Sequence, residues 1–274
     1  MRLIFLGHPC AASAATLSVT LARGQEIVAL ILAGSPSASP GAPERLADGA
    51  GIPVVWVRRA GEVAAALRAA APDVAVAACF PWRLPRAARE VPPLGILNVH
   101  PSLLPVGRGP EPVFWTLRRG ERMTGATVHR MDAGFDTGPI VARAEVSVAP
   151  GIQAPELENA LMSLGGRLLV DALPALAAGT LESEPQDSAG ASYAPVPVAA
   201  DWTMSPLLPA AWAWSFARGV APLGGPLAVI SGGEQIPVRD ALDWSEERLP
   251  ERIVTEDDGT IRVRFSPGWV RFQR

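Results

Sequence analysis

Short apolar runs alternate with segments of helical periodicity through the first 180 residues of the chain. Uninterrupted apolar runs of roughly four to eight residues are typical of strands that are buried on both faces. The pattern therefore predicts strands over 2–6, 26–32, 53–57, 73–79 and 95–99, and helices over 11–23, 44–49, 61–71 and 111–120. This alternation predicts an α/β fold with a Rossmann-like, mostly parallel sheet that carries helices on both of its faces.

The next part of the chain adds two strands and a long helix. The strands predicted over 125–131 and 138–148 form an antiparallel addition to the sheet, and the apolar period predicts a helix over 155–178. We expect this helix to bend near Pro174, because proline removes a main-chain hydrogen bond inside a helix. The first predicted domain covers residues 1–182.

The pattern changes after residue 182. The stretch 183–200 is rich in Pro, Ser, Gly, Asp and Ala, shows no period, and is interpreted as a linker. A helix over 207–218 and several short strands follow, with a hairpin signal at Asp258-Gly259 between two alternating runs. Residues 201–274 are therefore predicted to form a small β-rich barrel.

Composition narrows the possible chemistry. The net charge of −3 gives no overall basic field for nucleic acid, and the 24 basic residues include no lysine. A Schiff-base, pyridoxal-phosphate or P-loop lysine is therefore excluded. Cys10 and Cys79 lack the spacing of a zinc site, so we expect two small buried thiols and no metal. Without a signal peptide or a long apolar run, the protein is expected to be cytoplasmic and without a membrane partner.

Two polar clusters carry the candidate chemistry. Asn98 and His100 alternate with apolar residues, so both side chains are predicted to point to the same side at the carboxyl end of a buried strand. Open α/β sheets bind their ligands at such strand ends. Asp136 follows in a second polar cluster and supplies a carboxylate that can orient the histidine. An Asn, His and Asp set favours general acid–base chemistry with oxyanion stabilisation over covalent catalysis.

The order and spacing of several motifs are very specific. They are Asn98-Val99-His100-Pro101-Ser102-Leu103-Leu104-Pro105, Arg108-Gly109, Thr124-Gly125 and Met131-Asp132-x-Gly134-x-Asp136-Thr137-Gly138. With these motifs the chain resembles the folate-dependent formyltransferase family, which includes the methionyl-tRNA, sugar and glycinamide ribonucleotide enzymes. The resemblance spans nearly all of residues 1–180. It continues more weakly over the tail, which it identifies as similar to an oligonucleotide-binding (OB-like) domain.

The resemblance implies that a formyl group moves from 10-formyltetrahydrofolate to a primary amine. It places the catalytic residues at Asn98, His100 and Asp136, where Asn98 and a protonated His100 stabilise the oxygen and Asp136 raises the pKa of the histidine. The folate pocket implied by the resemblance involves Phe80, Trp82, Leu84, Asp132, Gly134 and Phe135. Residues assigned to the acceptor are His8, Ser102 and Arg108, whereas His129 and the pair Phe114-Trp115 are interpreted as structural.

The identity of the acceptor stays open at this point. The loop 34–43 has no basic residue, and Asp201 to Arg274 contains eight arginines against ten acidic residues, a weak surface for phosphates. We therefore favour a small-molecule amine, such as an amino sugar nucleotide or an amino-acid-type intermediate, over methionyl-tRNA. A 10-formyltetrahydrofolate hydrolase, with water as acceptor, is a second alternative, and a non-catalytic folate-binding protein is a third. A homodimer is also left open.

Overall fold

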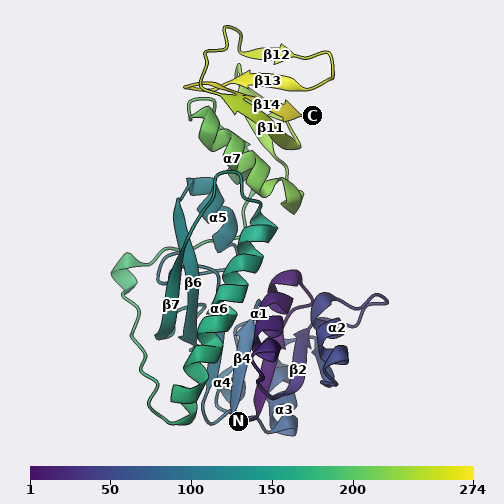
Figure 1. Ribbon diagram of the computed structural model, residues 1–274, viewed down its shortest axis with the longest axis vertical. Helices are drawn as coiled ribbons and strands as arrows, with labels where there is room; N and C mark the ends of the chain where they lie inside the picture. Colours follow the sequence, from purple (N-terminus) through teal and green to yellow (C-terminus); the bar gives the residue numbers. More distant parts are fainter. The chain divides into compact units, whose positions relative to one another are not determined.

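The computed structural model describes all residues 1–274, and its first part is built on one seven-stranded sheet (Figure 1). The strands stand in the order β3-β2-β1-β4-β5-β6-β7, with β1 to β5 parallel and β6 antiparallel to β5. Their bounds are β1 Leu3–Gly7, β2 Ile27–Ala33, β3 Val54–Val57, β4 Val74–Ala78, β5 Ile96–His100, β6 Met123–Arg130 and β7 Ile140–Ser147. The predicted α/β fold class, with its mostly parallel sheet, is confirmed.

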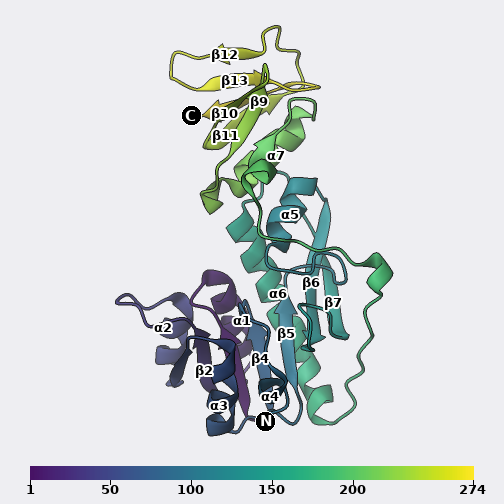
Figure 2. The ribbon, with the colours of Figure 1, turned by 180° about the vertical axis from the view of Figure 1, so that it is seen from behind.

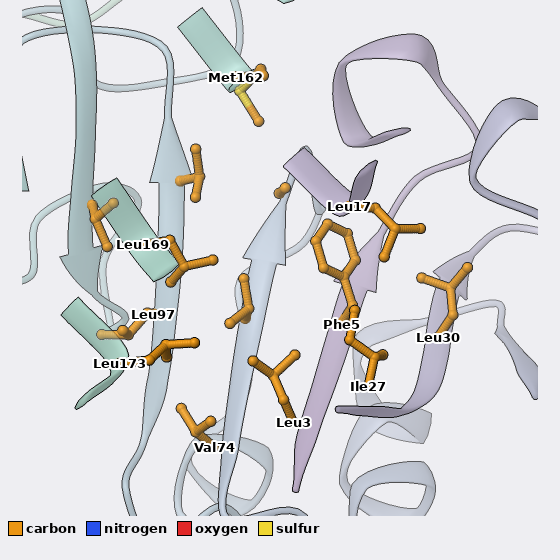
Figure 3. Packing of buried hydrophobic residues seen from close by; sticks show 14 of the residues in the cluster. Leu3, Phe5, Leu17, Ile27, Leu30, Val74, Leu97, Met162, Leu169 and Leu173 are labelled. Carbon is orange, nitrogen blue, oxygen red and sulfur yellow. The ribbon is translucent and has the colours of Figure 1, made fainter. Parts of the chain in front are cut away.

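Helices cover both faces of this sheet. One face packs against α1 (Ala11–Ala22), α2 (Ala42–Gly49) and α6 (Ala154–Ala177), and the other against α3 (Ala60–Ala70) and the short α4 (Arg86–Arg89) (Figure 2). Alternate residues of each strand enter the two cores, as strand geometry requires. Figure 3 shows Leu3 and Phe5 in the core beneath α1 and α6, whereas Ile4 and Leu6 belong to the opposite core.

Helix α6 lies close to β5 because it carries a glycine at the contact. A Cβ atom at Gly165 would overlap a methyl group of Val99, so no larger residue fits without movement. Met162, Leu169 and Leu173 of the same helix are buried in the sheet core. By length and composition α6 is the one helix apolar enough to cross a membrane, and its burial here explains that apolar composition.

A second compact unit comprises residues 113–123, 147–157 and 195–274. Its strands form two sheets, β10-β9-β8 and β11-β14-β13-β12. The bounds are α5 Pro112–Arg119, α7 Ala210–Val220, β8 Thr203–Met204, β9 Ala228–Ser231, β10 Glu234–Pro237, β11 Asp240–Ser245, β12 Ile253–Thr255, β13 Ile261–Arg264 and β14 Trp269–Gln273. Short 3₁₀ helices lie at Ala199–Trp202 and Ala221–Leu223, and a further one, Ser188–Gly190, belongs to the first unit. The predicted β-rich tail is confirmed.

Side chains in this unit agree with the sequence interpretation in two places. Phe114 is buried and lies 4.8 Å from the ring centre of Trp202 and 5.8 Å from that of Phe216, so it belongs to a core. The Asp258-Gly259 turn joins β12 and β13 as an antiparallel hairpin. Strand β11 was not predicted, because a bulge between Ala241 and Asp243 interrupts the alternation of its sequence.

Candidate active site

A crevice opens where the chain changes direction in the sheet. From β1 the chain continues to β2 on one side, whereas β4 continues to β5 on the other side. The carboxyl ends of the strands at such a switch point are the usual ligand site of an open α/β sheet. A cavity of about 540 Å³ lies at this edge, and the residues that line it are His8, Cys10, Cys79, Phe80, Pro81, Asn98, Val99, His100, Pro101, Gly109, Pro110, Pro112, Phe135, Asp136, Glu158 and Tyr193.

Asn98 reaches the cavity from β5, and its amide is held by two neighbours. Its Nδ2 lies 3.0 Å from Nε2 of His129 and 3.4 Å from Oδ1 of Asp136. The pairing of β5 with β6 sets Asn98 directly opposite His129. The amide is therefore oriented by a cross-strand contact as well as by the loop that carries Asp136.

His100 is almost completely buried, with 5% of its surface exposed. Its Nε2 donates to the carbonyl oxygen of Gly107 at 2.8 Å, and its Nδ1 lies 3.7 Å from Oδ1 of Asp136. Burial lowers the pKa of His100 and outweighs the opposing influence of Asp136 and the Gly107 carbonyl. Asp136 acts on the pKa of His100 in the direction expected from the sequence, but the expectation of a protonated ring is wrong, because it neglected the desolvation of the ring.

Asp136 is the charged member of the set. Burial by itself would raise its pKa, but His100, His129 and the main-chain amide of Gly109 together hold the pKa well below its usual range. The Gly109 nitrogen donates to Oδ2 at 2.9 Å. Asp136 has a φ of +54°, a left-handed conformation that aspartate tolerates better than most residues. The carboxylate is therefore ionised and fixed beside the two rings.

Gly109 must be glycine for this contact to form. Its φ is +106°, and an added Cβ atom would lie 2.7 Å from the ring of Tyr193 and 3.0 Å from the carbonyl oxygen of Ala194. Its main chain can adopt this conformation, which brings its amide to Asp136, only because glycine has no Cβ atom to meet those neighbours. The Arg108-Gly109 motif thus has a physical role in the site.

His129 is the site residue that sequence reasoning missed. Its Nε2 lies 3.5 Å from Oδ1 of Asp136, in addition to the contact with Asn98, and its Nδ1 donates to the carbonyl oxygen of Arg130 at 3.0 Å. The alternation of residues along β6 was a signal from which the position of His129 beside Asn98 could have been predicted. Thr127 and His129 are two residues apart, so their side chains point to the same face of the sheet. In the pairing of the two strands they lie opposite His100 and Asn98.

Some of the predicted ligand-binding residues line the cavity and others support its walls. His8, Phe80 and Phe135 line it. Trp82 meets the Phe80 ring edge-on at 5.5 Å, and Leu84 is buried in the sheet core.

Asp132 shapes the loop that follows β6. Its Oδ1 accepts hydrogen bonds from the nitrogen of Gly134 at 2.9 Å and from the hydroxyl of Thr137 at 2.7 Å. An added Cβ atom at Gly134 would overlap Thr137. Asp132 and Gly134 are not among the lining residues, so they act on the cavity through the shape of this loop.

The two remaining acceptor candidates hold loops together. Ser102 is buried, and its hydroxyl donates to the carbonyl oxygen of Val106 at 2.7 Å. Both Nε and Nη2 of Arg108 donate to the side-chain oxygen of Gln186, at 2.9 and 2.8 Å. Neither Ser102 nor Arg108 is among the lining residues. No group of three or more His, Cys, Asp or Glu side chains in the structure has the arrangement of a metal site.

Comparison with known proteins identifies the family. A family model described as formyl transferase matches residues 39–173. The methionyl-tRNA formyltransferase of Acidothermus cellulolyticus is 34% identical over 281 residues, which cover 99% of this chain and 83% of that relative. The chain belongs to the formyl transferase family. The resemblance found in the motifs is therefore confirmed.

Similarity is higher over a shorter part of the chain. The methionyl-tRNA formyltransferase of Chloroflexus aggregans is 43% identical over 202 residues, which cover 70% of this chain and 64% of the relative's own length. Among solved structures, the N-formyltransferase of Helicobacter canadensis has a TM-score of 0.70 and 16% identity and covers 100% of this chain and 99% of its own. This last likeness shows that the two chains share a fold.

Proposed function

We propose that the protein transfers a formyl group from 10-formyltetrahydrofolate to a primary amine. The observation that carries the proposal is the convergence of Asn98, His100 and Asp136 on one cavity at the switch point of the sheet. These three residues are an amide donor, a neutral imidazole and a carboxylate. Acyl transfer to an amine needs such a set, and it needs no covalent enzyme intermediate. We place this activity in the cytoplasm.

The cavity suits a folate in size and in the character of its walls. Its volume of about 540 Å³ falls within the range of roughly 300–1,000 Å³ for small-molecule sites. Phe80, Pro81 and Phe135 supply apolar walls for a flat pteridine. The Helicobacter canadensis N-formyltransferase, which shares the fold, was solved with folinic acid. Bound here, the folate would supply the formyl group to the catalytic residues.

His100 acts as the base in this proposal. Its Nε2 keeps a proton, because it donates to the Gly107 carbonyl. In the neutral ring Nδ1 is therefore the free lone pair, and it accepts a proton from the attacking amine. Asp136, 3.7 Å from Nδ1, stabilises the positive charge that the ring gains.

Asn98 stabilises the negative charge that develops on the formyl oxygen. As the amine bonds to the formyl carbon, negative charge develops on the formyl oxygen. The bond from that carbon to the donor nitrogen then breaks as His100 passes to that nitrogen the proton it took from the amine, and tetrahydrofolate leaves. The Nδ2 contact with Asp136 is long, at 3.4 Å, so one amide proton is weakly held and available to that oxygen. A preorganised donor of this kind is worth about 3–4 kcal/mol in the transition state.

A small acceptor with a positive charge fits the remaining wall best. Glu158 lines the cavity. Burial raises its pKa to about 7, with further contributions from Cys10 and Glu111. A cationic group on the acceptor would stabilise the ionised form of this partly buried carboxyl group. The absence of basic residues from the loop 34–43 also favours a small amine over a nucleic acid.

Methionyl-tRNA is the alternative acceptor, and two observations favour it. The relatives at 43% and 34% identity are methionyl-tRNA formyltransferases. In the second unit, Arg248, Arg252 and Arg264 line a cavity of about 690 Å³, and three guanidinium groups in one cavity suit phosphate oxygens. Hydrolysis, with water in place of the amine, uses the same three catalytic residues.

The test is a product assay with three acceptors in parallel. The protein is incubated with 10-formyltetrahydrofolate and a panel of small amines, with methionyl-tRNA, or with buffer alone, and formylated product and formate are measured by mass spectrometry. Product from a small amine supports the proposal, whereas product only from the tRNA assigns the alternative. Formate alone indicates a hydrolase. If the folded protein releases no formyl group in any arm, the proposed activity is wrong.

A further inference from the structure

We propose that Cys10 and Cys79 are a hydroperoxide-sensitive thiol pair, in which Cys10 is the attacking thiol and Cys79 resolves the oxidised product as a disulfide. The two cysteines are 69 positions apart in the sequence, and neither belongs to the catalytic set. The inferred modification is independent of formyl transfer. Only its effect on the cavity, described below, rests on the proposed function.

The topology of the sheet brings the two thiols together. Strands β1 and β4 are neighbours, with Gly7 paired to Ala78 at their carboxyl ends. Cys79 follows Ala78 directly. After Gly7 the chain turns back, with the nitrogen of Cys10 donating to the carbonyl oxygen of His8 at 2.7 Å. Both side chains line the same cavity.

The surroundings of Cys10 favour its thiolate. Cys10 is the N-cap of the 12-residue helix α1, and its sulfur accepts from the nitrogen of Ser13 at 3.5 Å. The neighbouring Cys79 thiol is the largest influence, and with Ser13 and His8 it outweighs burial and lowers the pKa of Cys10 well below its ordinary value. A thiolate at a helix N-terminus is the reactive form of cysteine.

Cys79 has the opposite environment and the complementary role. The neighbouring Cys10 sulfur, together with burial, raises the pKa of Cys79 well above the ordinary value, and the carboxylates of Glu158 and Glu111 act in the same direction. Cys79 therefore stays a thiol until its partner is oxidised. This difference divides the pair into one nucleophile and one proton-bearing partner.

The proposed oxidation consumes one hydroperoxide. The Cys10 thiolate attacks the terminal peroxide oxygen, the O–O bond breaks, and a sulfenic acid forms while an alcohol, or water from hydrogen peroxide, leaves. Cys79 then loses its proton and attacks that sulfur, and water leaves as the S–S bond forms. The two sulfurs lose two electrons in total, and the peroxide gains them.

The disulfide would change the wall of the cavity. Cys79 has a φ of +56°, a left-handed conformation uncommon for cysteine, and it is followed directly by Phe80 and Pro81, which line the cavity. A covalent bond from Cys79 to Cys10 would restrict this segment. If the cavity binds the folate, as proposed above, the oxidised protein should bind a folate analogue at least tenfold more weakly, and thiol reduction should restore binding.

The decisive experiment follows the thiols and needs no folate. The full-length protein is treated with increasing hydrogen peroxide, its free thiols are blocked, and its peptides are analysed by mass spectrometry. We expect a peptide pair joined through Cys10 and Cys79, with a loss of two hydrogens that dithiothreitol reverses. Cys79→Ser should stop at a Cys10 sulfenic acid, trapped as a dimedone adduct.

Cys10→Ser is the matched variant. Its remaining Cys79 should react with peroxide at least tenfold more slowly than Cys10 does in Cys79→Ser, because it keeps its proton. Equal rates for the two variants, two unmodified thiols in the wild type, or a disulfide that joins different molecules would each overturn the proposal. Circular dichroism of both variants shows whether they are folded, and a Cys10→Ala variant replaces Cys10→Ser if the serine disturbs the helix cap.

Discussion

The side-chain nitrogen of Gln186 donates to the main-chain carbonyl oxygen of Asp136 at 2.9 Å and to that of Gly138 at 2.8 Å. The side-chain oxygen of the same glutamine accepts two hydrogen bonds from Arg108. Gln186 therefore connects the loop that carries Asp136 to the loop that follows β5. It lies 50 positions after Asp136, in a stretch whose composition suggested only a linker.

Replacing Gln186 with Leu should slow formyl transfer through a loss of positioning. The carbonyls of Asp136 and Gly138 lose their donor, and a hydrogen bond of this kind contributes about 0.5–1.5 kcal/mol. We expect kcat to fall by roughly tenfold and the free energy of unfolding to fall by about 1–3 kcal/mol. Gln153→Leu, which changes an exposed glutamine, is the control. A kcat that does not change would show that Gln186 does not position the loop.

Removing the proposed catalytic groups should have a larger effect on turnover than on folding. His100→Ala and Asp136→Asn should each lower kcat by roughly 10²- to 10⁴-fold, because the base or its charge partner is lost. Asn accepts the left-handed conformation of position 136, so Asp136→Asn tests the charge alone. Single-turnover assays with the best acceptor measure the effect. Turnover within tenfold of the wild type in either variant would refute the assigned roles.

Stability should decrease on the acid side of neutrality. Burial lowers the pKa of His100, so the unfolded chain takes up a proton first, and the contribution of the neutral ring is complete above an unfolded pKa of about 6.5. That contribution is lost as the pH falls towards the folded pKa. The pKa of Asp136 is also lowered, so its contribution is complete above about 3.9 and is lost below that value. Urea unfolding at several pH values should show both changes.

His100→Gln tests whether His100 causes the loss of stability that begins near pH 6.5. Glutamine keeps a donor but does not titrate, so the fall in stability that begins near pH 6.5 should flatten in this variant, whereas the fall below about 3.9 should remain. The same unfolding curves provide the measurement. An unchanged slope between roughly pH 5 and 6.5 would mean that another group causes the loss.

The contact between α6 and β5 can be tested by changing the size of both partners. Gly165→Ala should destabilise the protein by about 1–3 kcal/mol, because the new methyl group meets Val99. Adding Val99→Ala should recover part of this loss, so that the two changes are not additive. Gly61→Ala is the matched control in a helix, since nothing lies within 4 Å of its Cβ position. Additive effects would show that the two sites do not touch.

Glu158→Gln tests the charge of the acceptor. The neutral amide keeps the shape of the side chain but removes its attraction for a cation. The KM for a positively charged amine should therefore rise by roughly tenfold, and kcat should change little. Glu156→Gln, at an exposed position on the same turn of α6, is the control. Equal KM values for cationic and neutral acceptors in wild type and variant would remove Glu158 from acceptor recognition.

The sheet and the proposed catalytic set are predictable from the sequence because both depend on local patterns. Alternation along β5 is enough to place Asn98 and His100 on one side of the strand. The roles of His129 and Gln186 depend instead on long-range contacts, namely the register of β6 against β5 and the return of residues 183–194 to the sheet. The charge state of His100 depends on burial, which no spacing of residues reports.

The main chain of residues 183–194 returns to the sheet, where Glu184 bridges to Ile140 at the start of β7 and Tyr193 bridges to Arg108 in the loop that follows β5. This pairing limits where evolution can exchange the carboxyl-terminal part of the chain for another domain. A crossover upstream of Ala194 would replace part of the scaffold beneath the site together with the carboxyl-terminal part. A crossover after it would graft a new tail onto an intact site, so a family that diversifies its tails should preserve its junctions there.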